Sequence, residues 1–110
     1  MTVRELSENA KFKALTLPCP EREIHGVYVG DLLSWVMGRA KADNAWITIM
    51  SNVNVLAVAT LADTACVILA EDVVPDPEVL TAALEKGINV LSTPLTAYEA
   101  AVVLSRQEEI

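Results

Sequence analysis

From residue 24 onward, segments with the pattern of β-strands alternate with segments with the pattern of α-helices. The strand pattern covers residues 24–29, 46–50, 65–70 and 88–91, the helix pattern covers residues 31–40, 77–86 and 96–106, and the apolar segment 53–62 is assigned as a helix below. This alternation is typical of a parallel sheet with helices on its faces, because parallel neighbours need a long crossover connection that is usually helical. An earlier strand over residues 12–17 ends at two prolines and is expected to join antiparallel at an edge. The sequence therefore predicts one domain, a three-layer α/β/α sandwich with a mainly parallel sheet of about five strands.

The segment 53–62 is the ambiguous one, because it is apolar on every side and its periodicity fits a buried helix or a strand. Fourteen residues, 51–64, separate the strands on either side of it. That length suits a helical crossover between parallel strands, and Asn52 or Asn54 can cap its first turn. We therefore expect a helix.

Several residues mark where the other helices begin. Thr2 with Glu5, and Thr96 with Glu99, have the spacing of a capping box. The first of these helices should end near residue 10, and the second should run to about residue 106, with a fraying tail over 107–110. Asp31 is the expected N-cap of the helix that follows it. In the same way, residues 76–78 read Asp-Pro-Glu, which places a proline and an acid in the first turn of a helix.

Charge and hydropathy exclude two classes of partner. The 15 acidic and 8 basic residues give a formal charge of -7, and no basic cluster is present to displace counterions from a nucleic acid. No stretch reaches the roughly 20 apolar residues of a membrane span. The N-terminal residues lack a secretory pattern, and Cys19 and Cys66 have neither metal-ligand nor redox-pair spacing. These features predict a cytoplasmic protein with reduced cysteines that binds neither nucleic acid nor membrane.

The sequence lacks the motifs of the common phosphate-handling enzymes. It has no Gly-Lys pair for a P-loop, and its four glycines do not form a dinucleotide-binding motif. His25 is the only histidine, and the sequence does not indicate a serine or cysteine nucleophile that it would activate. Glu71 and Asp72 follow a predicted strand and can act as acid and base, but adjacent loop residues usually point apart. We expect no catalytic residue, no metal site and no cofactor, with a small hydrolase or transferase built on these three residues as the alternative.

Three polar turns follow predicted parallel strands and should meet at one edge of the sheet. Their polar and glycine residues are Gly30 and Asp31, then Ser51, Asn52 and Asn54, then Thr93. Helix N-termini open beside each turn, and their free amides can hold an anion or a nucleotide phosphate. The sequence predicts a ligand site here. The alternative is that Asp31, one of the two asparagines and Thr93 only cap their helices.

Trp35 lies about 130° from the centre of the apolar stripe of its predicted helix on a helical wheel. It should not point straight into the core, and Arg39 follows it one turn later. Tryptophan and arginine are favoured at the centres of interfaces, and a symmetric dimer is the simplest such partner, with another protein as a further one. A ring folded over the flank of its own helix is the competing interpretation.

Residues 26–38, which read Gly-Val-Tyr-Val-Gly-Asp-Leu-Leu-Ser-Trp-Val-Met-Gly, resemble small stand-alone proteins of the DRTGG-domain group. That group is akin to the N-terminal domain of HPr kinase/phosphorylase. Residues 45–48, 55–59 and 87–93 extend the resemblance over nearly the whole chain. Residues 51–54, where the residues that name the group would lie, contain neither an Asp-Arg pair nor paired glycines.

The resemblance implies the three-layer sandwich of that N-terminal domain and an accessory, regulatory role, because catalysis in the larger members belongs to a separate domain. Taken with the missing chemistry, it favours a non-catalytic regulatory or interaction module. Such a module would be homodimeric and would bind a small metabolite or nucleotide. A purely scaffolding subunit of a larger metabolic complex is the alternative.

Overall fold

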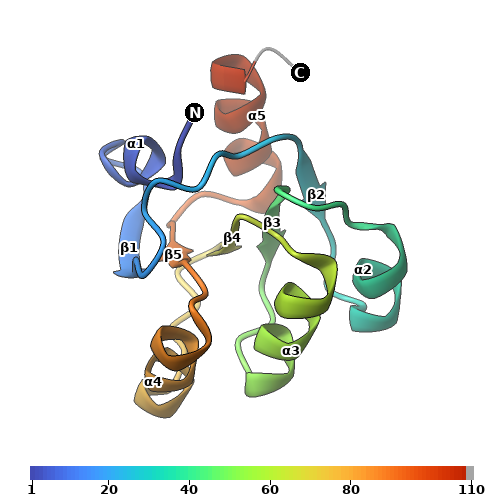
Figure 1. Cartoon of the computed structure of the whole chain (residues 1–110). Helices are drawn as coiled ribbons and strands as arrows, with labels where there is room; N and C mark the ends of the chain where they lie inside the picture. Colours follow the sequence, from blue (N-terminus) through green and yellow to red (C-terminus); the bar gives the residue numbers. More distant parts are fainter. Residues whose placement is uncertain (109–110) are drawn as a thin grey trace.

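The computed structural model describes residues 1–108 and contains five helices and five strands within that range (Figure 1). In chain order the elements are α1 (Val3–Ser7), β1 (Lys13–Thr16), β2 (Val27–Val29), α2 (Leu33–Arg39), β3 (Ala45–Thr48), α3 (Val53–Ala62), β4 (Cys66–Leu69), α4 (Pro77–Lys86), β5 (Val90–Ser92) and α5 (Ala97–Glu108). From β2 onward, strand and helix alternate as the sequence predicts.

The five strands form one sheet in the order β1-β5-β4-β3-β2. The pairs β2–β3, β3–β4 and β4–β5 are parallel, and β1 pairs antiparallel with β5. The register between β1 and β5 shifts after Ala14, which marks a bulge at this edge. The mainly parallel sheet with an antiparallel edge strand is thus confirmed.

Helices cover both faces of the sheet, so the molecule has three layers (Figure 1). On one face, α1 and α5 pack on a core that includes Leu6, Ile47 and Leu104. On the other face, α2, α3 and α4 pack on a core that includes Trp46 and Leu56. All four residues of β3 and of β4 are buried, as expected for central strands covered on both sides.

The apolar segment 53–62 forms helix α3, as its spacing predicts. Asn52 caps it: the side-chain oxygen accepts a hydrogen bond from the Asn54 N–H. Asp63, in the left-handed conformation, ends it. Its lack of periodicity arises because apolar residues also occupy its outer side, where Val53 and Leu61 are exposed.

The predicted start of α2 was wrong. The helix begins at Leu33, and the N-cap position is taken by Leu32, which has no side-chain capping bond within the described residues. Asp31 does not cap the helix because its carboxylate is bonded to β3 instead. Leu32 and Met37, two apolar residues of the segment 31–40, are exposed, and Val36 is the residue of α2 that is fully buried.

Other boundaries moved by a few residues. The strand predicted over 24–29 is limited to Val27–Val29, because Gly26 adopts a positive φ of 81° just before it. Helix α1 ends at Ser7. Both capping boxes are formed as predicted, by Thr2 with Glu5 and by Thr96 with Glu99.

Two further helix ends differ in detail from the prediction. Asp76 holds the N-cap position of α4, but its side chain makes no capping bond in the described structure. Helix α5 continues through residues 107 and 108, where a fraying tail was predicted, and residues 109–110 of that tail lie outside the described residues. Within residues 1–108, no helix combines the length and apolar character needed to cross a membrane.

Candidate functional site

The carboxyl ends of the parallel strands meet at one edge of the sheet, which we call the carboxyl-end rim and define as residues 30–31, 49–54, 70–72 and 92–95. Hydrogen bonds link its segments. The Asp31 carboxylate bonds to the end of β3, the Ala70 N–H donates to the Thr48 carbonyl, and the Thr93 N–H donates to the Leu69 carbonyl. The three predicted turns therefore lie on a common edge.

Asp31 ties the end of β2 to the end of β3. Its Oδ1 accepts hydrogen bonds from Thr48 Oγ1 at 2.8 Å and from the Ile49 N–H at 3.0 Å. The neighbouring Gly30 carbonyl accepts a 2.8 Å bond from the indole N–H of the buried Trp46. A Cβ at Gly30 would lie 2.9 Å from the Tyr28 ring, so a larger residue here would require that ring to shift. The first predicted turn is thus held in place from both sides.

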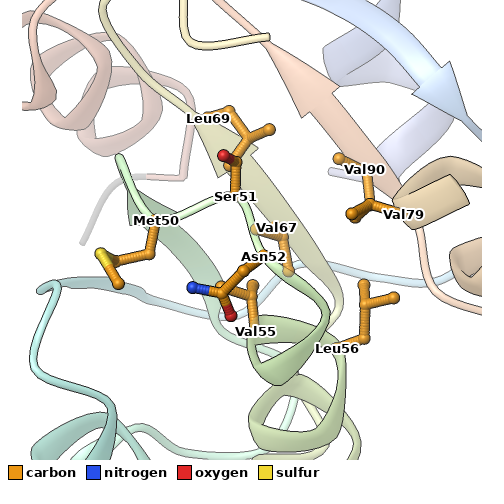
Figure 2. A pocket seen from close by; sticks show the side chains of 9 residues that line it. All are labelled: Met50, Ser51, Asn52, Val55, Leu56, Val67, Leu69, Val79 and Val90. Carbon is orange, nitrogen blue, oxygen red and sulfur yellow. The ribbon is translucent and has the colours of Figure 1, made fainter. Parts of the chain in front are cut away.

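Ser51 and Asn52 lie at the mouth of a small cavity between α3, α4 and the sheet (Figure 2). Below them the walls are apolar, and Val79 and Val90 close the side opposite Met50. The cavity measures about 10 Å³, which is roughly the space of a single water molecule. A nucleotide does not fit inside it, so a ligand at this turn must lie on the outer surface of the rim.

The asparagines of this turn differ in how they are used. Asn52 Oδ1 is occupied as the N-cap of α3. The Asn54 side chain is exposed and makes no hydrogen bond within the part of the chain that the structure describes. Asn54 can therefore reach a ligand without breaking an internal bond.

Thr93 is buried, and it does not cap α5. Its hydroxyl donates to the Lys11 carbonyl at 2.7 Å and accepts a bond from the Leu95 N–H at 3.2 Å. Its own carbonyl accepts the Asp72 N–H at 3.0 Å. The Thr93 hydroxyl is thus used in hydrogen bonds within the protein. It holds its turn in place, and it neither caps α5 nor contacts a ligand directly.

The residues of the alternative catalytic hypothesis do not come together. His25 lies ahead of β2, at the amino end of the parallel strands, whereas Glu71 and Asp72 follow the carboxyl end of β4. Glu71 and Asp72 both adopt left-handed backbone conformations, with φ of 58° and 59°. Among residues 1–108, no group of three or more His, Cys, Asp or Glu side chains is arranged to hold a metal ion.

The cysteines occupy different environments. Cys66 is fully buried in β4, and burial raises the pKa of its thiol to about 12, so the thiol stays protonated. Cys19 is exposed, and its sulfur lies 3.5 Å from the Gly87 carbonyl oxygen. Neither forms a disulfide in the described part of the chain.

Trp35 lies outside the core, on the exposed side of α2. It is 51% exposed, and the Arg39 guanidinium carbon lies 3.7 Å from the centre of its ring. This is the stacked geometry of a cation–π pair. Two other exposed apolar residues, Val29 and Leu32, occur nearby in the sequence, at the end of the edge strand β2 and the start of α2.

Two polar features of the structure had no counterpart in the sequence prediction. At the amino end of the sheet, Arg22 bonds to the carboxylates of Asp43 and Asp63 at 3.0 and 2.8 Å. At the carboxyl-end rim, a larger cavity of about 260 Å³ opens beside Lys13 and Asp72. Both features join residues from distant parts of the chain, and no local pattern could reveal them.

Fold and rim together define a small α/β domain with helices on both faces of a mainly parallel sheet and polar turns gathered at its carboxyl edge. The family model described as the DRTGG domain matches residues 21–107. The chain belongs to the DRTGG domain family, which confirms the resemblance found in the sequence. Comparison with the curated proteins finds no match.

One similar solved structure is described as the CBS and DRTGG domains of the regulatory region of Clostridium perfringens pyrophosphatase, complexed with the activator diadenosine tetraphosphate. Its TM-score is 0.72 at 14% sequence identity. The match covers 94% of this chain and 45% of that one. The likeness establishes the fold, and this chain spans less than half of that regulatory region.

Proposed function

We propose that the chain is a non-catalytic regulatory module that acts in the cytoplasm and binds a small metabolite or nucleotide at the carboxyl-end rim. Membership of the DRTGG family and the fold shared with a regulatory region support the regulatory part of this proposal. The nucleotide activator of that pyrophosphatase makes adenine nucleotides the first ligands to try. Polar turns gather at the carboxyl-end rim, and His25 lies at the opposite end of the sheet from Glu71 and Asp72. This arrangement favours ligand binding over catalysis.

The observation that carries the proposal is the convergence of Gly30, Asp31, Ser51, Asn52, Asn54 and Thr93 on one edge beside the N-terminus of α3. A phosphate group is stabilised at such a helix end by free N–H groups and by the helix dipole. In this arrangement Asn54 and the backbone of residues 51–53 meet the ligand. Asp31, Asn52 and Thr93 hold the three turns in register through the bonds described above.

The test is a thermal-shift titration with AMP, ATP and diadenosine tetraphosphate, followed by calorimetry for any nucleotide that raises the melting temperature. Asn54→Ala should abolish the rise without lowering the melting temperature of the free protein, because the Asn54 amide has no internal role. Asn52→Ala removes a helix cap worth about 1 kcal/mol, so Asn52→Ser, which keeps a capping oxygen, is its matched control. If none of the three nucleotides shifts the melting temperature, the nucleotide-binding proposal fails and a scaffolding role remains.

The same proposal includes a homodimer formed through Trp35 and Arg39. Their stacked side chains present a flat, half-exposed surface next to an edge strand, and both residue types are common at the centres of interfaces. Light scattering after size exclusion at tens of micromolar should give the mass of a dimer, and Trp35→Ala should give a monomer. A strict monomer, or a dimer unchanged by Trp35→Ala, would overturn this part of the proposal.

A further inference from the structure

The cavity of about 260 Å³ lies at the carboxyl-end rim, on the side away from Asn54. One wall is formed by the antiparallel pair β1–β5, through Lys13, Leu15 and Ser92. The other wall is the loop that joins β4 to α4, with Asp72 at its start, and the Leu80 side of α4. These residues lie outside the six of the proposed nucleotide site.

The strand wall has a defined orientation. Lys13 and Ser92 are register partners, so their side chains project to the same face of the sheet. Leu15 lies at the bulge in β1, where regular alternation is interrupted, and its packing on the core beneath α4 places it on that same face. The cavity therefore has an aliphatic floor and a polar mouth.

The mouth carries one charge of each sign. Lys13 and Asp72 both line it, yet neither forms an ion pair with the other or with a third residue among residues 1–108. Both side chains are exposed at the rim, which leaves the ammonium and the carboxylate available to a bound molecule. The backbone at Asp72 is anchored by its N–H bond to the Thr93 carbonyl.

The apolar part of the cavity is aliphatic. Its apolar lining residues are Leu15, Val73, Val74, Pro75 and Leu80, of which Val74 is largely exposed, and no aromatic side chain lines it within the described chain. Its volume is below the roughly 300–1,000 Å³ typical of sites for drug-sized ligands. A nucleotide, which needs a larger site and a platform for its base, fits these features poorly. A compact molecule with a short branched chain fits them well.

We propose that this cavity binds a free branched-chain α-amino acid of the size of leucine or valine. Lys13, with the Ser92 hydroxyl beside it, receives the carboxylate of the ligand, and Asp72 receives its ammonium group. The aliphatic side chain enters between Leu15 and Leu80. A ligand carrying both charges is favoured, because it pairs with both protein groups at once, whereas a ligand with one charge forms only one of the two ion pairs.

The experiment is a titration of the full chain with leucine up to about 10 mM, followed by amide NMR shifts and calorimetry. Saturable shifts are expected at Leu15, Leu80 and Ser92, with Asn54 unaffected. Lys13→Gln and Asp72→Asn should each weaken binding at least about tenfold. Both residues are exposed and free of ion pairs within residues 1–108, so these variants should keep the fold. Lys41→Gln, an equal change of charge at an exposed lysine far from the cavity, should leave binding unchanged.

Three analogues test the recognition chemistry. 4-Methylpentanoate lacks the ammonium, 3-methylbutylamine lacks the carboxylate, and glycine lacks the side chain, so each should bind at least about tenfold more weakly than leucine. Absence of saturable leucine binding would overturn the proposal, as would leucine binding that is insensitive to both Lys13→Gln and Asp72→Asn. Because the nucleotide site is probed through Asn54, either site can fail while the other stands.

Discussion

Replacing Thr64 by valine is expected to stabilise the domain. Thr64 lies between α3 and β4, is only 7% exposed, and its Oγ1 finds no hydrogen-bond partner among the residues that the structure describes. A buried hydroxyl without a partner has lost its bonds to water and gained none in return. Valine has the same branched shape and places a methyl group where the hydroxyl stands.

The size of the effect follows from the burial. An unsatisfied buried polar group costs about 1–3 kcal/mol, so the substitution should raise the free energy of unfolding by about 1–2 kcal/mol. A chain of 110 residues has an unfolding entropy of about 0.23 kcal/mol/K near its melting temperature. The melting temperature should therefore rise by about 4–9 °C.

Thr16→Val is the matched control, because it makes the same chemical change at a buried threonine whose hydroxyl is fully used. Thr16 Oγ1 donates to the Ile88 carbonyl at 2.9 Å and accepts from the Val90 N–H at 3.0 Å. Valine at this position would leave both backbone groups unsatisfied and should lower stability by about 2 kcal/mol or more. Urea denaturation and calorimetry of the two variants measure the opposite signs. A Thr64→Val protein that is less stable than the parent would show that the hydroxyl makes a productive bond, and the reasoning would fall.

Three further predictions follow from the backbone and from the titratable groups. Glu71→Gly should raise the free energy of unfolding, measured by urea denaturation, by about 1 kcal/mol. The reason is that φ is 58° at this position, where residues other than glycine are strained. A lower free energy of unfolding would mean that the Glu71 side chain contributes more than the strain costs. In the native protein at about pH 8, a thiol reagent should modify Cys19 alone, because the pKa of the buried Cys66 thiol is raised to about 12; modification of both thiols before unfolding would contradict the structure. The pKa of Glu99 is lowered by hydrogen bonds from the backbone N–H and the hydroxyl of Thr96, so its contribution to stability is present above the ordinary value of 4.5 and is lost as pH falls through the lowered pKa. Glu99→Ala should accordingly lower the urea midpoint at pH 7 and have less effect near pH 3, and an effect that grows on acidification would refute this assignment.

The order of elements could be predicted because most of them are encoded by their own residues. The apolar run before Glu71 has the composition of a strand covered on both faces, and it forms β4. Segment 53–62 was assigned by the length of the connection between parallel strands and not by its own pattern, and that argument holds for α3. The capping boxes were visible as pairs of residues three positions apart.

The sequence predicted that the three polar turns lie at one edge of the sheet. It did not predict what each side chain does there. Asp31 has the local propensity of an N-cap, but Thr48 and Ile49 offer its carboxylate two bonds from 17 and 18 positions away. Those donors become neighbours only when β2 and β3 pair. Local propensity gives way to tertiary contacts of this kind, and a single sequence does not reveal them.

The paired glycines that help to name the family would lie just after the strand at 46–50, and this chain has none there. Within residues 1–108, two consecutive residues adopt the left-handed conformation, Glu71 and Asp72. Glycine adopts that conformation without a steric penalty. Glutamate and aspartate do not indicate a left-handed backbone in the way that glycine does. The strained turn, and the cavity that Asp72 lines, therefore could not be found from composition or spacing.

β1 pairs with β5, which is synthesised much later, so this edge of the sheet cannot form until most of the chain has been made. Thr16 meets Ile88, 72 positions later in the chain, and at about 5–20 residues per second a ribosome needs roughly 4–14 s to make the intervening residues. Throughout that interval β1 has no strand to pair with, and the sheet face beneath α1 and α5 stays uncovered until α5 emerges from the exit tunnel. A nascent chain of this design therefore exposes an apolar surface and an unpaired edge for seconds, and a chaperone that shields early segments should increase the yield of folded protein more than one that acts after release.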